Sequence, residues 1–204
     1  VRALIAARAD INQAMPDGWT ALMHAAQKGH TEIVKALIDA GVNVNKANNN
    51  GWTALMRAAQ EGRTDIVKAL IDAGANVNKA NNNGSTALML AAYNGRTEIV
   101  RALIAARADI NQAMPDGSTA LIFAAENGYT EIVQDLIAAG ANVNKTLESG
   151  WTALMLAAQN GHIEIVQTLR AVEGNKARTA APTPFLIAAQ TSYSGISSHK
   201  GPAL

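Results

Sequence analysis

Each stretch of about 33 residues carries an apolar stripe at helical spacing, and shorter apolar runs precede it. In residues 64–73, Ile66, Val67, Leu70 and Ile71 form one apolar stripe at helical spacing, and the charged residues between them fall on the opposite side. This pattern predicts an amphipathic helix with one face in a core and the other in water. The shorter apolar runs that precede it predict the other elements of the unit.

A tight turn and a short helix are predicted before that amphipathic helix. The Asn-Asn-Gly sequence at 49–51 is a turn signal because Asn and Gly tolerate positive φ, so we expect a short hairpin with the two asparagines at its tip. Thr53 suits the N-cap of a short helix over residues 54–60. Gly62 is expected to end that helix in a left-handed conformation.

The whole pattern recurs with a period of 33 residues. The motif Thr-Ala-Leu begins at Thr20, Thr53, Thr86, Thr119 and Thr152. An alanine pair, a glycine and an Ile-Val pair follow each copy at constant distances. A fixed period of this length indicates an all-α solenoid of stacked helix-turn-helix units with short β-hairpin tips, because a globule with one central core has no reason to repeat.

The combined motifs resemble ankyrin repeats. Gly-x-Thr-x-Leu, Ala-Ala-x-x-Gly and Ile-Val-x-x-Leu-Ile-x-x-Gly-Ala-Asn-Val-Asn recur at the 33-residue period. The resemblance covers residues 1–173, as a partial unit followed by five full repeats. Residues 1–18 are identical to residues 100–117, so they resemble the second helix and hairpin of a preceding unit. The resemblance implies an ankyrin-repeat array.

Two departures from the family pattern lead to expectations about packing and strain. The family's first-helix histidine is replaced by an apolar residue in every unit, where we expect apolar packing between repeats. These residues are Met23, Met56, Met89, Ile122 and Met155. Arg8 and Arg107 occupy the position of the family's helix-ending glycine, so we expect a left-handed arginine there at a cost of about 1 kcal/mol.

Residues 174–204 depart from the period. A copy of the first-helix motif at 183–189 arrives 31 residues after Thr152 instead of 33, and no Ile-Val helix follows it. We expect residues 174–191 to form a degenerate C-terminal cap. Residues 192–204 are rich in Ser, Gly and Pro, and we expect a mobile tail there.

Composition excludes several classes of function. The formal net charge is +1, which offers no strong field to nucleic acid or to an anionic membrane. The chain has no cysteine, so thiolate chemistry is excluded and a cytoplasmic location is expected. No apolar run reaches the roughly 18 residues of a membrane helix. The chain starts at Val1 with no leader peptide, and we interpret it as a fragment of a longer protein.

The sequence contains no motif for catalysis or for cofactor binding. A metal site needs three or more converging ligands, and the four histidines are scattered along the chain. No phosphate-binding glycine loop and no nucleophile elbow is present. We therefore expect a protein that is not an enzyme and that has no cofactor and no metal.

The resemblance implies that a partner binds the concave face, which hairpin tips and first helices form. Positions that vary between units are the candidates for choosing that partner. One varying column holds three tryptophans, and we expect Trp19 and Trp52 to form an aromatic pair; alternatively, each tryptophan packs on its own hairpin. The predicted partner-binding residues are Trp19, His24, Asn49, Asn50, Trp52, Arg57, Asn82, Asn83, Tyr93, Asp116, Glu126 and Trp151.

These observations predict a monomeric protein–protein interaction module whose partner is another protein or a peptide, and neither nucleic acid nor a membrane. One alternative is a structural or targeting arm of a longer multidomain protein, such as an enzyme, channel or effector. Another is a synthetic repeat scaffold, which the duplicated residues 1–18 favour. Self-association through the tail also remains open, because residues 182–193 are apolar enough to bind a concave surface.

Overall fold

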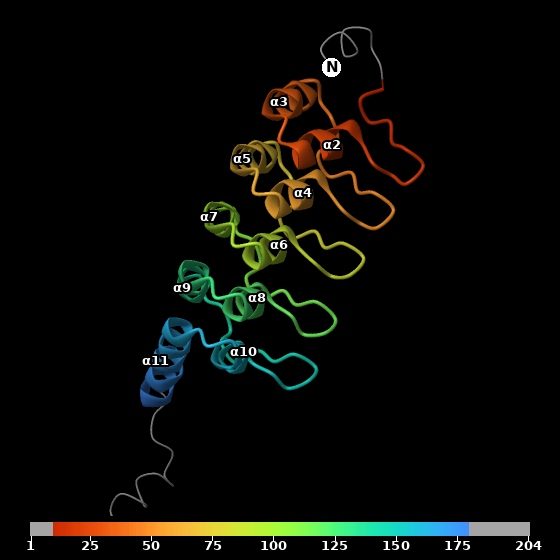
Figure 1. Cartoon of the computed structure of the whole chain (residues 1–204). Coiled ribbons are helices and arrows are strands. Elements are labelled where there is room, and N and C mark those ends of the chain that lie inside the picture. Colours follow the sequence, from red (N-terminus) through yellow and green to blue (C-terminus); the bar gives the residue numbers. More distant parts are fainter. Residues whose placement is uncertain (1–9, 180–204) are drawn as a thin grey trace, which may run out of the picture.

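The structure is a row of helix pairs that stack on one another in single file (Figure 1). The computed structural model describes residues 10–179. The first helices of the pairs are α2 (Ala21–Lys28), α4 (Ala54–Gln60), α6 (Ala87–Tyr93), α8 (Ala120–Glu126) and α10 (Ala153–Gln159). The second helices are α3 (Thr31–Asp39), α5 (Thr64–Asp72), α7 (Thr97–Ala105), α9 (Thr130–Ala138) and α11 (Ile163–Thr179). This arrangement confirms the predicted solenoid.

Local rules set the ends of the first helices. The Thr53 hydroxyl accepts a hydrogen bond from the Met56 backbone N–H (3.3 Å), and the equivalent threonine caps each of the other first helices in the same way. Gly62 follows α4 with a φ of 73°, as predicted, because glycine enters this left-handed region without a steric penalty. Each short helix is therefore specified by residues in or beside it.

The core runs along the whole stack. Ile66, Val67 and Leu70 of α5 are almost completely buried, as are Ala58 and Ala59 of α4. The small alanines allow the close approach of neighbouring units, and α4 packs against both α2 and α6 as well as against α5. Burial between units supplies the stability that one short helix pair lacks by itself.

The column of apolar residues that replaces the family histidine packs between units as predicted. Met56 and Met89 are 1% exposed, and Met23 and Ile122 are equally buried. Met155 is the exception, since 50% of it is exposed at the last described pair. The stack therefore presents an apolar surface at its C-terminal end.

The hairpin tips form a hydrogen-bonded row beside the helices. The Asn49 N–H donates to the Asp17 carbonyl (3.0 Å), and the Asn82 N–H donates to the Asn50 carbonyl (3.1 Å). A matching bond joins the fourth and fifth hairpins. Pro115 has no N–H, so the third and fourth hairpins lack this bond. Isolated antiparallel bridges close four of the five described hairpins, the fourth being the exception, in agreement with short β tips.

Arg107 adopts the left-handed conformation expected of it, with a φ of 62°. It follows α7 at the position that glycine occupies after other second helices, and the side chain is exposed. Arg8, its counterpart in the partial first unit, lies outside the described residues.

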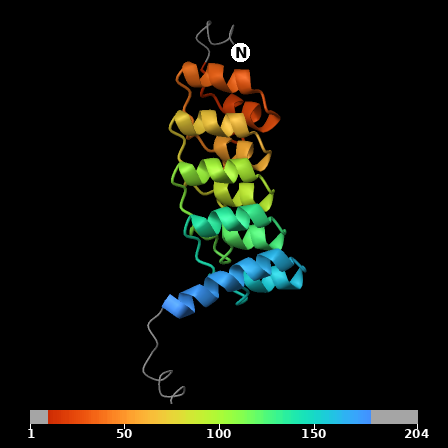
Figure 2. The same ribbon diagram turned by 90° about the vertical axis from the view of Figure 1, so that its left-hand side faces the viewer.

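Helix α11 differs from the other second helices by its length of 17 residues (Figure 2). Gly41, Gly74 and Gly140 end three of the others with φ values of 80°, 82° and 92°. Glu173 occupies the matching position in α11 and lies within the helix, unlike the left-handed Arg107 after α7, so the helix continues to Thr179. The helix thus crosses the predicted boundary at 173, and the division of the chain there stays a prediction. The motif at 183–189 and the predicted tail lie outside the described residues.

The length and the hydropathy of the described helices bear on whether one could span a membrane. None of those within residues 10–179 combines the length and the apolar character needed to cross a bilayer.

Candidate functional site

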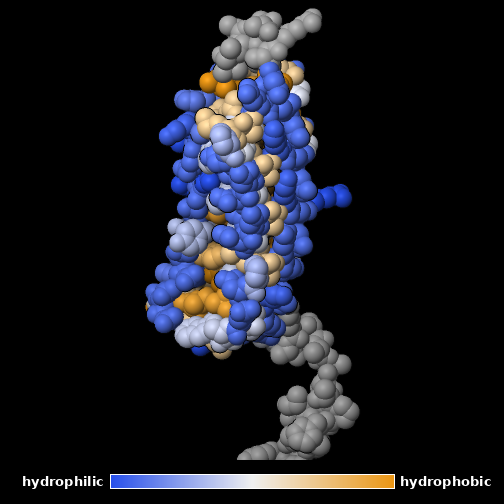
Figure 3. Space-filling view, turned by 90° about the vertical axis from the view of Figure 1, so that its right-hand side faces the viewer, coloured by the Kyte–Doolittle hydropathy of each residue, from blue (hydrophilic) through white to orange (hydrophobic). Residues whose placement is uncertain are grey.

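Hairpin tips and first helices together form one side of the stack, which we call the inner face. The second helices form the opposite side, which we call the outer face. Figure 3 shows the hairpin side, where hydrophilic residues dominate and hydrophobic residues appear in a broken line along the stack and in patches toward both ends. Most of the predicted partner-binding residues lie on the inner face.

Four predicted residues come together at the first two units. The Arg57 guanidinium carbon lies 3.8 Å from the centre of the Trp52 ring and 4.8 Å from that of the Trp19 ring. The His24 ring packs on Trp19, with 4.7 Å between ring centres. We call these four residues the Arg57 cluster. The expected aromatic pair is thus replaced by a cation–π arrangement, because a flat guanidinium can contact both rings.

The cluster leaves Arg57 with hydrogen-bonding capacity. Its Nη1 donates to Gln60 Oε1 (3.2 Å), whereas its buried Nε has no partner among the described residues. Burial lowers the pKa of Arg57, and the negative charge of Glu61 acts in the opposite direction. Arginine nevertheless keeps its charge in proteins, so the cluster presents a partly desolvated cation.

A second aromatic site lies further along the stack. Tyr93, at the end of α6, is 52% exposed and meets the Phe123 ring edge-on at 5.5 Å between centres. This geometry is the favoured one for two aromatic rings. Tyr93 was predicted as an exposed aromatic contact, and Phe123 supports it from the next unit.

The predicted tip residues are exposed, but some are occupied by bonds within the array. Asn49 Nδ2 donates to the Pro16 carbonyl (3.0 Å), and Asn82 Nδ2 donates to the Asn49 carbonyl (3.1 Å). Asp116 Oδ1 accepts from the Ser118 N–H (2.9 Å). Asn50 and Asn83 are also exposed. The tips therefore combine a structural role with access to solvent.

Glu126 and Trp151 lie apart from the Arg57 cluster. Glu126 is exposed at the end of α8, and its carbonyl accepts bonds from Asn160 Nδ2 (2.8 Å) and from the His162 ring (3.0 Å). Trp151 is 37% exposed and precedes α10, near the exposed Met155. The structure therefore divides the predicted residues among several places along the stack.

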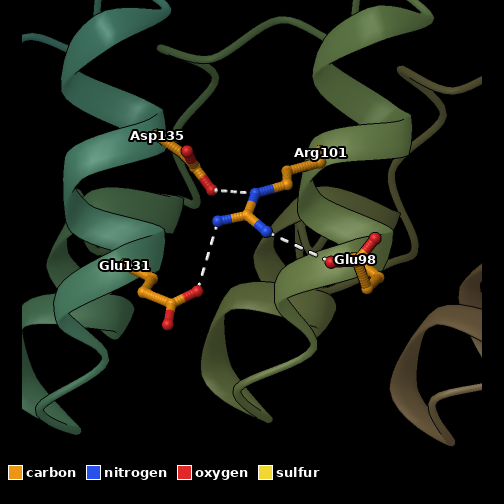
Figure 4. Close-up of polar contacts among 4 residues, drawn as sticks. All are labelled: Glu98, Arg101, Glu131 and Asp135. Carbon is orange, nitrogen blue, oxygen red and sulfur yellow. Dashed lines mark hydrogen bonds and ion pairs between the residues drawn. The ribbon is translucent and has the colours of Figure 1, made fainter.

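The outer face carries a charge cluster that the sequence analysis did not predict. Arg101 of α7 donates from Nε to Asp135 (2.7 Å), from Nη2 to Glu131 (3.2 Å) and from Nη1 to Glu98 (3.1 Å), as Figure 4 shows. Hydrogen bonding to Asp135 raises the pKa of Arg101. The spacing of Glu98 and Arg101 on one helix was a visible signal, but the contacts to α9 depend on how the units stack.

The side-chain grouping that a metal site requires is not provided by the described residues. No group of three metal-binding side chains converges in the part of the chain that the structure describes. An open hollow of about 310 Å³ on the outer face lies beside Arg101 and Asp135 and is otherwise lined by Ile104 and alanines.

Comparison with known proteins identifies the family. The family model described as ankyrin repeats (3 copies) matches residues 1–81, 75–147 and 136–196. No curated protein matches the sequence significantly. The family match covers most of the chain and agrees with the stacked helix pairs of the structure.

Proposed function

The chain belongs to the ankyrin-repeat family, and from this premise we propose that the array is a non-enzymatic module that binds a protein or peptide on its inner, concave face. Ankyrin repeats in general serve protein–protein interaction. The finer statement, that the inner face of this chain holds the partner, rests on its own residues.

The Arg57 cluster is the observation that carries the proposal. Tryptophan and arginine are enriched among residues that dominate binding energy at interfaces. The matching positions in the third unit are Ser85 and Leu90, yet that unit stacks on its neighbours as the second does. The scaffold therefore does not need a Trp–Arg arrangement, which favours a role in recognition.

Co-purification with the array tests the proposal. Wild-type protein, Trp52→Ala and Tyr93→Ala are compared for capture of the same partner, and we expect both variants to lose most of it. Truncation of a central interface aromatic typically costs about 2 kcal/mol or more, which is roughly 30-fold in affinity.

Lys68→Ala is the matched control, because Lys68 is exposed on α5 of the outer face. We expect it to capture the partner as wild type does. Unchanged capture by both inner-face variants, with their folding verified by circular dichroism, would remove the inner face as the binding site.

The proposal extends to the oligomeric state of the protein and to the classes of partner that it does not bind. We propose that the module acts as a monomer and binds neither nucleic acid nor membrane. Within residues 10–179 the first helices carry only Lys28, Arg57 and Glu126 as acidic or basic residues, which is not the basic track that nucleic acid requires. Light scattering after size-exclusion chromatography measures the molar mass of the protein in solution. A molar mass of two chains would contradict the proposed monomer.

A further inference from the structure

The chemistry of Arg57 indicates what kind of partner group the inner face accepts. Trp52 and Trp19 contact the guanidinium carbon. Contact with a ring uses the face of the guanidinium, whereas its N–H bonds point outward in the guanidinium plane. The two rings therefore fix the position of the cation without using its N–H donors, of which Nη1 is shared with Gln60 and Nε is buried.

Charge balance around Arg57 is incomplete. None of the ion pairs in the described part of the chain involves Arg57, and its one side-chain hydrogen bond there runs from Nη1 to Gln60 Oε1 (3.2 Å), whereas Nε is buried and out of reach of a ligand. By contrast, all three carboxylates around Arg101 pair with that single arginine. A cation that is held in place, partly desolvated and unpaired is a site for an external anion.

We propose that Arg57 binds the carboxylate of an Asp or Glu side chain in a partner peptide, with Trp19 and Trp52 packing against the rest of that residue. The inference rests on the proposed function of the inner face and names the chemistry of its partner. A carboxylate matches the guanidinium because two parallel N–H···O bonds form in one plane. Loss of water from the site strengthens these bonds.

A second contact defines the spacing within the peptide. Tyr93 and Phe123 offer an exposed aromatic surface one to two units beyond Arg57. Neighbouring helices lie about 8–10 Å apart, and an extended peptide rises about 3.3 Å per residue. The partner segment therefore carries an apolar residue about three to six positions from its acidic residue.

The charges of the inner face favour a peptide over a polyanion. The described first helices offer two basic residues and one acidic residue, Lys28, Arg57 and Glu126, and the hairpin tips add the acidic Asp17, Asp116 and Glu148. Single-stranded nucleic acid needs a continuous positive groove along its backbone. One fixed cation beside aromatic rings instead matches one carboxylate among apolar side chains.

Selection from a random 12-residue peptide library displayed on phage tests the inference. Purified wild-type chain is the bait, and Trp52→Ala protein removes peptides that do not use the inner face. We expect the remaining peptides to share an Asp or Glu followed or preceded by an apolar residue at the spacing above.

The selected peptide is then synthesised with its acid and with the matching amide, Glu→Gln or Asp→Asn. Wild-type protein is expected to bind the acid at least about tenfold more tightly than the amide. Arg57→Met keeps the aliphatic stem and removes the charge, so it should bind both peptides equally. Arg101→Met is the matched control on the outer face and should discriminate as wild type does.

The outcomes separate the two proposals. Peptides that need Trp52 but show no acidic preference would overturn the carboxylate site and leave the inner face as a binding surface. A library that yields no peptide dependent on Trp52 would overturn both. Equal affinity of wild-type protein for the acid and amide peptides would also overturn the inference. This comparison uses wild-type protein alone and does not depend on the folding of a variant. Tighter binding of a 12-nucleotide single-stranded RNA than of the acidic peptide, lost in Arg57→Met, would replace the peptide by nucleic acid.

Discussion

Arg57 and Arg101 occupy opposite faces of the same stack and have opposite surroundings. Arg101 is exposed and reaches three carboxylates, two of them on the neighbouring helix α9. Arg57 is half-buried beside two tryptophans and pairs with none of the described carboxylates. The outer-face arginine thus forms ion pairs within the array, whereas the charge of the inner-face arginine has no such partner among the described residues.

This difference shows why residue type alone does not locate a binding site in a repeat protein. An arginine whose donors are occupied links neighbouring units, and its exposure adds little recognition. An arginine held by aromatic rings keeps its donors for a ligand. The number of internal partners therefore separates the two roles better than exposure does.

The largest expected effect is a reversal of charge at each arginine. Arg57→Glu is expected to weaken binding of the selected acidic peptide by about 100-fold, because attraction becomes repulsion at a partly desolvated site. Arg101→Glu should leave peptide affinity unchanged. Isothermal titration calorimetry measures both, and equal losses in the two variants would erase the distinction between the faces.

Salt is expected to weaken binding of the acidic peptide to the inner face by less than charge reversal at Arg57 does. Raising NaCl from about 50 to 500 mM shortens the screening length, so affinity for the acidic peptide should fall by on the order of fivefold. Binding of the amide peptide should hardly change. Fluorescence of the cluster's tryptophans provides the measurement, and a salt response shared by both peptides would argue against a charge contact.

A still smaller effect is expected on stability when the inner-face charge is removed. Arg57→Met loses a cation–π contact but also removes the buried Nε that lacks a partner, and these changes oppose each other. We expect the unfolding free energy to change by less than about 1 kcal/mol, or about 2–4 °C in Tm. A drop of more than about 8 °C would show that Arg57 is retained for folding.

The smallest effect is expected at the outer face. Asp135→Asn removes the shortest contact of Arg101, yet the site is exposed and two other carboxylates remain. Thermal unfolding followed by circular dichroism should show a Tm change of at most about 2 °C, which vanishes in 1 M NaCl. A large shift that persists in salt would mean that this cluster holds the stack together.

Most of the fold follows from local sequence signals. Thr53 and Gly62 mark the ends of one helix through rules that involve only their near neighbours in the chain, and the 33-residue period copies those rules. The exception is the length of α11. Glu173 stands where other second helices have the terminal glycine. The 33-residue period is lost at the same position, so the predicted boundary was placed there and the extension of the helix was not predicted.

The repeat pattern indicated which residues could face a partner, but not how their side chains contact one another. Trp19, Trp52 and Arg57 were each expected to contact a partner, yet their mutual contact joins two units and depends on how the side chains pack. Asn49 and Asn82 likewise satisfy carbonyls of the preceding hairpin. Such contacts between units follow from the stacking geometry, which a single period does not contain.

The missing N–H of Pro115 has a mechanical consequence. It interrupts the row of backbone hydrogen bonds between the tips of the third and fourth hairpins, while the Asp109 N–H still donates to Asn78 Oδ1 (2.7 Å) and the helices remain packed across the junction. We expect the array to bend at this junction when it binds a partner whose surface curvature differs slightly from its own. The Arg57 cluster lies on one side of that junction and Phe123 on the other, and the Tyr93–Phe123 contact spans it, so bending there changes the distance between the two aromatic sites.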